Sequence, residues 1–369
     1  MSAINQAKRG VALLKLDKPA PDHERVVHQA LASRIARLLG LPYLPNPQSV
    51  PASRRYHLPN DTLADESLCT QLGIRATEDF FGGKVPFPFV ATKALSHARF
   101  PSSPAPTGWS DGFCIEVGDA LLDGYTVFDK AGAHEAGEAL LATAPCRLKP
   151  VRATAGRGQH VITCLQQLEQ VLAPMDEAQL ATWGLVLEQQ LEQVQTFSVG
   201  QITVAGTTLS YHGTQQLTTD HQNQEVYGGS TLVLARGGYD QLLAMPLDDH
   251  LRIAIDQACR FESAAFRHYP GLVASRRNYD IARGLDQDGH WRSGVLEQSW
   301  RVGGASSAEI LALEAFIADP ACQYLQASTH EVFGECQVPD DAVLFYQGDD
   351  REVGKICKYA RVQPYGRPE

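Results

Sequence analysis

RLKPVRATAGRGQHVI (Arg147–Ile162) is the stretch that decides the fold. It predicts a strand that ends at Lys149 and Pro150, then a glycine-rich turn, then a second strand. A lysine at a strand end, next to the free backbone N–H groups of a glycine turn, suits a polyphosphate because both point into one small volume. Taken alone the pattern is weak, since such a stretch is more often only a hairpin.

A second stretch, SRRNYDIARG followed by SGVLEQSWRVGGAS, carries acidic residues on two strands that we expect to pair through a turn at Asp286–Gly289. Asp280 and Glu297 should then converge on one edge of the sheet. Two carboxylates together with phosphate oxygens are the donors that Mg²⁺ prefers. Arg301 follows, and Gly303–Ser306 leads into a predicted helix whose N-terminal amides favour an anion. Each residue alone has a structural explanation, but the ordered set indicates metal and phosphate binding.

Composition limits the class of protein. The 369 residues predict two or three packed units. With 44% hydrophobic and 20% charged residues the chain should fold. A formal net charge of −10 argues against a broad nucleic-acid surface. The eight cysteines form no C-x-x-C pair and no apolar run is long enough for a membrane span, so we expect a cytoplasmic protein that binds neither nucleic acid nor membrane.

Hydrophobic periodicity and turn residues predict alternating helices and strands. Thr163 with Gln166, and Ser306 with Glu309, match the capping-box pattern of helix starts. The proline-rich residues 41–92 are expected to be an irregular surface wrap. Further predictions are a strand at Gly10–Leu16, a helix ending before Gly40, a long helix over residues 249–266, and hairpins that turn at Ala205–Gly206 and Asp349–Gly354.

In their order and spacing, these motifs resemble the ATP-grasp superfamily over roughly residues 90–310. The matching segments are VATKALSH around Lys93, the lysine-proline strand with its glycine loop, LVLEQQL, and the region from Asp280 to Arg301. Phrases such as FFGGKVPFPFVATKA and SGVLEQSWRVGGASSAEI are similar to an uncharacterised bacterial ATP-grasp family that is sometimes loosely labelled biotin carboxylase.

The resemblance implies an ATP-grasp fold of mixed α/β and α+β character. Its parts would be an N-terminal α/β domain over residues 1–92 and a central region over 93–187 that includes a mobile lid from about 125 to 187. A C-terminal domain over 188–369 would hold the magnesium and substrate sites. ATP would bind between the last two parts.

The resemblance also implies roles for residues around ATP. Lys93 and Lys149 would bind the phosphates, and Gly156 and Gly158 would let the lid backbone approach them. The Glu188–Leu191 backbone would read the adenine edge. Lys84 and Lys130 are alternatives to Lys93, and Glu192 would replace the usual ribose-binding acid.

On the metal side, Asp280 and Glu297 would hold Mg²⁺. Ser299 stands where the superfamily usually has asparagine, so its reach to the metal is shorter. Arg301, together with Lys149 and the amides of Gly303 and Gly304, would stabilise the charge on the transferred phosphoryl group.

The implied reaction joins a small-molecule carboxylate to an amine. ATP activates the carboxylate as an acyl phosphate, the amine attacks it, and ADP and phosphate are released. Two alternatives stay open: a biotin-carboxylase-like enzyme whose carrier is a separate chain, and a non-catalytic ATP-binding scaffold or sensor, which Ser299 favours. An oligomer is compatible with the sequence.

The sequence says less about which residues would bind the acceptor substrate. The polar stretch Ser210–Ser230 is either a substrate pocket, with His212, Tyr227 and Arg236 facing it, or a solvated loop. The adjacent arginines 276 and 277 either orient a substrate carboxylate or pair with surface acids.

Overall fold

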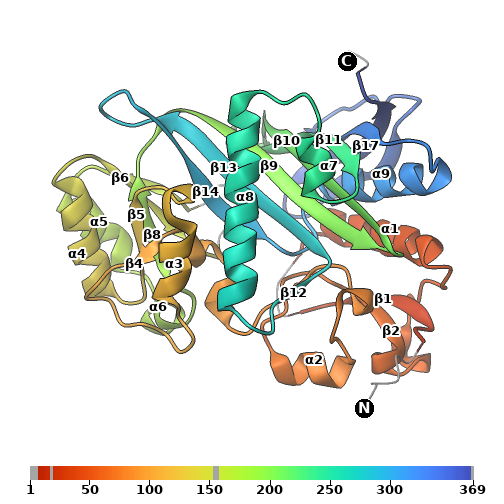
Figure 1. Cartoon of the computed structure of the whole chain (residues 1–369), viewed down its shortest axis with the longest axis horizontal. Coiled ribbons are helices and arrows are strands. Elements are labelled where there is room, and N and C mark those ends of the chain that lie inside the picture. The colour runs from red at the N-terminus through yellow and green to blue at the C-terminus, as the bar shows by residue number, and fades with distance from the viewer. Residues whose placement is uncertain (1–6, 17–19, 153–157, 367–369) are drawn as a thin grey trace.

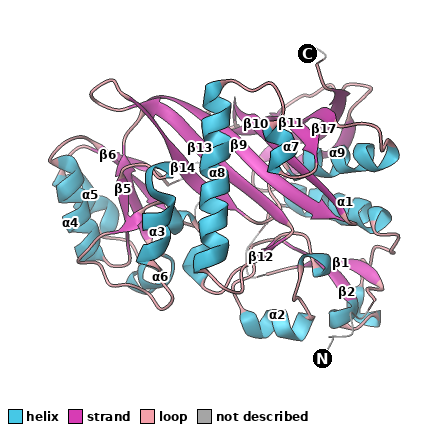
Figure 2. Ribbon diagram, in the orientation of Figure 1, coloured by secondary structure: helices cyan, strands magenta, loops and turns pink. Residues whose placement is uncertain are grey.

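A computed structural model describes residues 7–16, 20–152 and 158–366. Two large sheets organise this part of the chain, one of five strands and one of eight (Figure 1). Helices cover both sheets and give a mixed α/β fold (Figure 2). The functional site described below lies where the two sheets meet.

The smaller sheet and its helices share one apolar core. Leu148 and Leu187 on neighbouring strands pack with Leu168 of a covering helix, and all three are fully buried. Gly137 allows close helix packing, because a Cβ at this position would lie 2.2 Å from Leu168 Cδ2. In spatial order the strands are β4 (Ala98–Arg99), β5 (Gly124–Val127), β8 (Leu185–Gln189), β6 (Cys146–Pro150) and β7 (His160–Ile162), and the helices are α4 (Lys130–Leu141), α5 (Leu165–Leu172) and α6 (Glu177–Trp183).

The larger sheet is antiparallel throughout. Hairpins turn at Ala205–Gly206, Asp286–Gly289 and Asp349–Gly354, as predicted. Ala205 and Gly206 both have positive φ, 52° and 73°, which matches the right-handed twist of a tight hairpin. In spatial order the strands are β14 (Trp291–Ser299), β13 (Arg276–Leu285), β9 (Glu192–Val204), β10 (Thr207–Thr219), β11 (Glu225–Arg236), β15 (Tyr324–Phe333), β17 (Gly354–Pro364) and β16 (Val343–Asp350).

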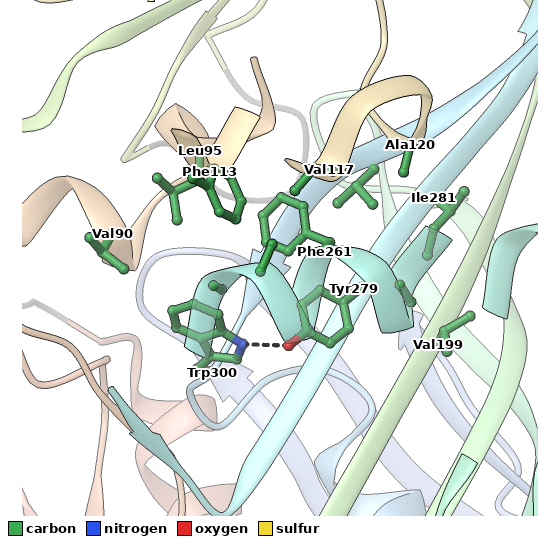
Figure 3. Packing of buried hydrophobic residues seen from close by; sticks show 14 of the residues in the cluster. Val90, Leu95, Phe113, Val117, Ala120, Val199, Phe261, Tyr279, Ile281 and Trp300 are labelled. Carbon is green, nitrogen blue, oxygen red and sulfur yellow. Dashed lines mark hydrogen bonds between the residues drawn. The ribbon is translucent and has the colours of Figure 1, made fainter. Parts of the chain in front are cut away.

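One face of the larger sheet is covered by α8 (Asp249–His268), which confirms the predicted long helix (Figure 1). Phe261 of α8 packs against Tyr279 of β13 with ring centroids 5.7 Å apart, and against Phe113 at 5.1 Å. Trp300 Nε1 donates a 3.2 Å hydrogen bond to the Tyr279 hydroxyl within this cluster (Figure 3). No helix in the described part of the chain, α8 included, combines the length and apolar composition needed to cross a membrane.

The opposite face carries α9 (Ser306–Ala318), with α1 (Asp22–Leu38) beside it. At the chain start β1 (Gly10–Leu14) pairs in parallel with β2 (Arg55–Pro59). The remaining elements are short: β3 (Gly83–Lys84), β12 (Val273–Ala274), α2 (Glu66–Leu72), α3 (Asp111–Val117), α7 (Tyr239–Leu243) and the 3₁₀ helices η1 (Pro47–Ser49), η2 (Ala52–Arg54), η3 (Thr77–Asp79), η4 (Pro88–Ala91), η5 (Lys93–Ser96) and η6 (Gly118–Ala120).

One prediction about loops is wrong, and one of two alternatives for a second segment is excluded. Residues 41–92 are not a surface wrap, because they contain β2 and α2 and fully bury Phe80 and Phe81. The stretch 210–230 is not a loop but most of the β10–β11 hairpin, with its polar side chains on a pleated sheet. Short elements separate the prolines of the first segment, and several polar residues of the second line the cavity described below.

Both predicted capping boxes are also wrong. Cys164 is the N-cap of α5 and makes no side-chain cap, and Thr163 bonds to Gln167 instead of Gln166. Ala305 is the N-cap of α9, and Glu309 is fully buried rather than turned back to the helix start.

Glu309 instead forms a buried ion pair behind the site. Arg276 Nε donates to Glu309 Oε2 at 3.0 Å and Arg276 Nη2 donates to Oε1 at 2.8 Å. Arg276 Nη1 also donates to the carbonyls of Ser299 at 2.9 Å and Arg301 at 2.7 Å. This bidentate pair ties β13 to α9 and holds the connection between β14 and α9.

We expect Glu309→Gln to destabilise the chain by roughly 3–5 kcal/mol, because it leaves the Arg276 charge buried and uncompensated. Glu314→Gln is the matched control, since Glu314 pairs with Arg34 at 2.6 Å but is 26% exposed. The stability lost in Glu314→Gln should be about 1 kcal/mol or less. Urea unfolding of both variants measures the difference, and equal losses would show that the buried pair has no special role.

Candidate functional site

A cavity of about 1580 Å³ opens between the two sheets. Arg147 and Lys149 of the smaller sheet form one side, and Asp280 and Glu297 of the larger sheet face it. Pockets for single small molecules usually measure about 300–1000 Å³. This cavity therefore has room for more than one small molecule.

Asp280 and Glu297 lie directly opposite each other on β13 and β14. Ser198 Oγ donates to Asp280 Oδ1 at 2.9 Å, and Asn278 Nδ2 donates to the same oxygen at 3.1 Å. Burial, and then the charge of Glu297, raise the pKa of Asp280 to about 6 despite these bonds. The ionised form of Asp280 is therefore destabilised, because its hydrogen bonds do not offset burial and the charge of Glu297.

Lys93 supplies the cation for the other carboxylate. Its Nζ lies 2.9 Å from Glu297 Oε2. Burial opposes ionisation of Glu297, but Lys93, followed by Arg301 and Lys149, outweighs burial and lowers the pKa of Glu297. Glu297 is thus ionised in the neutral pH range while Asp280 next to it holds its charge less readily.

Lys149 is held by a buried acid below the cavity wall. Its ammonium pairs with Glu188 Oε1, and His97 Nε2 lies 2.9 Å from Glu188 Oε2. Burial works against the Glu188 charge, but Lys149 and then His97 lower the pKa of Glu188 to about 2. His97 Nδ1 is itself fixed by the Leu122 carbonyl at 3.0 Å. Lys149 is therefore positioned by a rigid, charged support.

Comparison with known proteins identifies the family. A model for the family described as "Protein of unknown function (DUF3182)" matches residues 11–360. The chain belongs to this family. A search of curated proteins finds no match.

Solved structures show the fold of this DUF3182 chain. A crystal structure of the ADP complex of PurK, N5-carboxyaminoimidazole ribonucleotide synthetase, is similar at 11% identity and a TM-score of 0.51, covering 98% of this chain and 94% of that chain. Phosphoribosylamine–glycine ligase from Thermotoga maritima is similar at 11% identity and a TM-score of 0.50, covering 95% and 92%. At this identity the likeness shows the fold alone, and it confirms the predicted ATP-grasp fold.

The structure brings most of the predicted residues to this cavity. Lys84 and Lys130 do not line it: Lys84 pairs with Glu66 at 2.8 Å, and Lys130 donates to the Ala173 carbonyl. Gly156 lies outside the described residues. The predicted residues that line the cavity are Lys93, Lys149, Gly158, Asp280, Glu297, Ser299, Arg301, Gly303 and Gly304.

The predicted hinge residues Glu188 and Leu191 do not line the cavity. Glu188 lies in the middle strand of its sheet, between Arg147 and Gly124, so its backbone faces neighbouring strands and its side chain has the role described above. Leu191 is buried in a small apolar cluster. Glu192 is exposed at the start of β9 and does not line the cavity, so the structure gives it no place as a ribose ligand.

The Gly303 amide and the Ser299 hydroxyl, which lie beside the metal residues in the sequence, are both hydrogen-bonded within the protein. The Gly303 N–H donates to Ser306 Oγ at 3.1 Å, so this amide is already used. Ser299 Oγ accepts a 3.3 Å hydrogen bond from Arg276. The arginine itself forms the buried ion pair with Glu309, so the acid that it pairs with is not on the surface, and it also lines the cavity.

On the acceptor side, Tyr227 lines the cavity, with its hydroxyl 2.7 Å from Ser230 Oγ. His212 does not line it and is buried in the sheet. Arg236 donates to the carbonyls at Cys322 and Asp319, away from the cavity. Arg277 pairs with the half-buried Glu262 at 3.3 Å.

Sequence reasoning missed the residues that support the carboxylates. Asn278 precedes Asp280 by two residues, and side chains two apart on a strand point to one face, so this signal was present in SRRNYD. Ser198 lies opposite Asp280 on β9, and that pairing requires knowledge of the strand order. His97 likewise reaches Glu188 across 91 positions of sequence.

The pKa of Asp280 predicts a pH-dependent stability. Between about pH 4 and 6 the folded chain keeps a proton on Asp280 that the unfolded chain has released. The contribution of Asp280 to the free energy of unfolding therefore falls as the pH rises. We expect ligand-free Asp280→Asn to be more stable than the wild type at pH 7.5, by about 1–2 kcal/mol after discounting for solvent in the cavity. At pH 4 the gain should vanish.

Denaturant unfolding at both pH values tests this expectation. Asp288→Asn, at the exposed turn of the same hairpin, is the matched control and should show no pH-dependent gain. A loss of stability in Asp280→Asn at pH 7.5 would contradict the charge balance described here.

Proposed function

We propose that this chain is an ATP- and Mg²⁺-dependent ligase that activates a small-molecule carboxylate as an acyl phosphate for attack by an amine. One observation carries the proposal: Asp280 and Glu297 face each other across two strands, in a cavity that Lys93 and Lys149 also line. The similar structures support it, since one is an ADP complex and the other is named a phosphoribosylamine–glycine ligase.

The residues present fit a magnesium ion. Asp280 and Glu297 offer oxygen donors, and a cation between them would relieve the repulsion that raises the pKa of Asp280. Bound there, Mg²⁺ would neutralise charge on the phosphate oxygens of ATP.

The cations of the cavity would bind the polyphosphate. Lys93 and Lys149 are each paired with a carboxylate, so phosphate oxygens would share or replace these partners. Arg301 lines the cavity, makes a 3.8 Å contact with Asp61, and would hold the transferred phosphoryl group. Gly158, with φ of +68° and no side chain, lines the cavity and would let a phosphate approach its backbone closely.

The chemistry then proceeds on the bound substrates. A carboxylate oxygen attacks the γ-phosphorus, the bond to ADP breaks, and the acyl phosphate forms. The amine attacks the acyl carbon and phosphate leaves. Water must be kept from the acyl phosphate during this step, because it would otherwise hydrolyse it.

A non-catalytic ATP sensor is the second candidate, and one observation favours it. Ser299 occupies the position of a usual metal-binding asparagine, and its hydroxyl is bound by Arg276. A sensor would bind Mg-ATP without forming ADP.

ADP formation separates the two candidates. Purified chain is incubated with Mg-ATP and pools of carboxylates and amines, and ADP and product mass are followed. We expect Asp280→Asn and Glu297→Gln to lower turnover at least about 100-fold, since each 1.4 kcal/mol of lost transition-state stabilisation is worth about tenfold. Asp288→Asn is the matched control and should be unaffected. Tight ATP binding without ADP from any pool would instead favour the sensor.

Nucleotide binding has a separate test. We expect Lys149→Met to weaken Mg-ATP binding at least about tenfold, because the ammonium faces the cavity and no neutral group replaces its charge. Lys130→Met, in the same lobe but outside the cavity, is the matched control. Calorimetry on variants with wild-type circular dichroism measures both, and an unchanged dissociation constant for Lys149→Met would remove this residue from the phosphate site.

A further inference from the structure

One end of the cavity is lined by helix α1, which is a different element from the strands that carry the carboxylate pair. The N-cap Pro21 and positions 24 and 28 of this helix follow one another at about one turn, and all three line the cavity. Lys358 and Tyr359 of β17 also line this end. Because the whole cavity exceeds the volume that one small molecule needs, this end has room for the second substrate.

Two histidines of α1 line this end and differ in their bonding. His23 is buried and fixed: its backbone N–H donates to Asp350 Oδ2 at 2.8 Å, and its Nδ1 lies 3.0 Å from the same oxygen. His28 has no hydrogen-bond or ion-pair partner among the residues that the structure describes. A polar ring that lines a cavity without a partner keeps its bonding capacity for a ligand.

The surroundings of His28 keep its imidazole neutral. Burial is the main cause, and it lowers the pKa of His28 to about 4 against the opposing charge of Glu24. Arg301, in the connection before α9, and Lys358 on β17 lower the pKa further, as does His23. The last two are themselves paired, Lys358 with Glu331 at 2.9 Å and His23 with Asp350. A neutral imidazole has a free lone pair that can accept a proton.

Arg301 connects His28 to the reactive end of the cavity. The Arg301 charge lowers the pKa of Glu297 as well as that of His28. Arg301 is therefore near enough to affect both the imidazole and Glu297, and the ligase proposal assigns its guanidinium to the transferred phosphoryl group. An amine attacking the acyl phosphate would approach the same guanidinium.

We propose that His28 is the base that takes the proton from the attacking amine, and that the amine acceptor binds beside α1. This inference rests on the proposed ligase function. The nitrogen lone pair forms the C–N bond at the acyl carbon, the C–O bond to phosphate breaks, and phosphate leaves with that electron pair. The surplus proton on nitrogen passes to the imidazole, and no group is oxidised or reduced.

The charge of the substrate favours this transfer. Arg301 and Lys358 oppose a proton on His28 while the cavity is empty. A bound acyl phosphate brings negative charge next to Arg301 and offsets that effect as the reaction proceeds. The His28 imidazole is thus unprotonated before the amine binds, and it accepts a proton more readily once the acyl phosphate is bound.

Two nucleophiles separate this role from a structural one. Hydroxylamine is a strong nucleophile that is unprotonated at pH 7.5, so it attacks acyl phosphates with little help from a base. With Mg-ATP and the carboxylate pool, we expect His28→Asn to form hydroxamate within about twofold of the wild-type rate. With a pool of the twenty amino acids as amine acceptors, amide formation should fall about 100-fold or more.

His212→Asn is the matched control, because His212 also has a pKa lowered to about 4 by burial but does not line the cavity. It should leave both products unchanged. Equal loss of hydroxamate and amide in His28→Asn, or no loss of either, overturns the role of His28 alone. Failure of the wild type to form ADP with hydroxylamine overturns the ligase function, and the role of His28 with it.

Discussion

Two carboxylates held face to face set the conditions for the rest of the site. The antiparallel register of β13 and β14 places Asp280 opposite Glu297, and their like charges repel at the wall of a partly buried cavity. Lys93 neutralises one carboxylate, and hydrogen bonds from Ser198 and Asn278 partly support the other. The arrangement costs free energy in the empty chain, which is characteristic of residues placed for binding rather than for stability.

The scaffold behind the carboxylates is itself charged and fully buried. The Tyr211 hydroxyl lies 2.6 Å from Glu309 Oε1 and 2.9 Å from Asn278 Oδ1, and Asn278 donates to Asp280. Contacts therefore run without a break from the Arg276–Glu309 pair to the cavity wall. Across the cavity, Glu188 and His97 fix Lys149 in the same manner. Both halves of the site thus rest on buried polar groups that are satisfied by one another.

Local patterns in the sequence predicted the parts of the site that depend on short-range geometry. The turn at Asp286–Gly289 predicts that Asp280 and Glu297 lie on paired strands, and the strand end at Lys149 is equally local. The exact pairing is not local: the regular register from the turn would place Asp280 opposite Leu296, and a register shift between Asp280 and Ile281 brings it opposite Glu297. Glu309 shows the limit of such patterns: it matches a capping box, but a long-range ion pair with Arg276 decides its position. The link between Lys149 and Glu188 depends on the pairing of β6 with β8, which no local pattern specifies.

The central claim, a divalent cation between Asp280 and Glu297 next to a polyphosphate, has a direct structural test. Crystals grown with Mn²⁺ and a non-hydrolysable ATP analogue would locate the metal by its anomalous scattering. The account predicts one manganese bound to oxygens of both carboxylates and of the phosphates, with Lys93 and Lys149 at the phosphates. Nucleotide bound in the cavity with no metal at these carboxylates, or with manganese elsewhere, would contradict it.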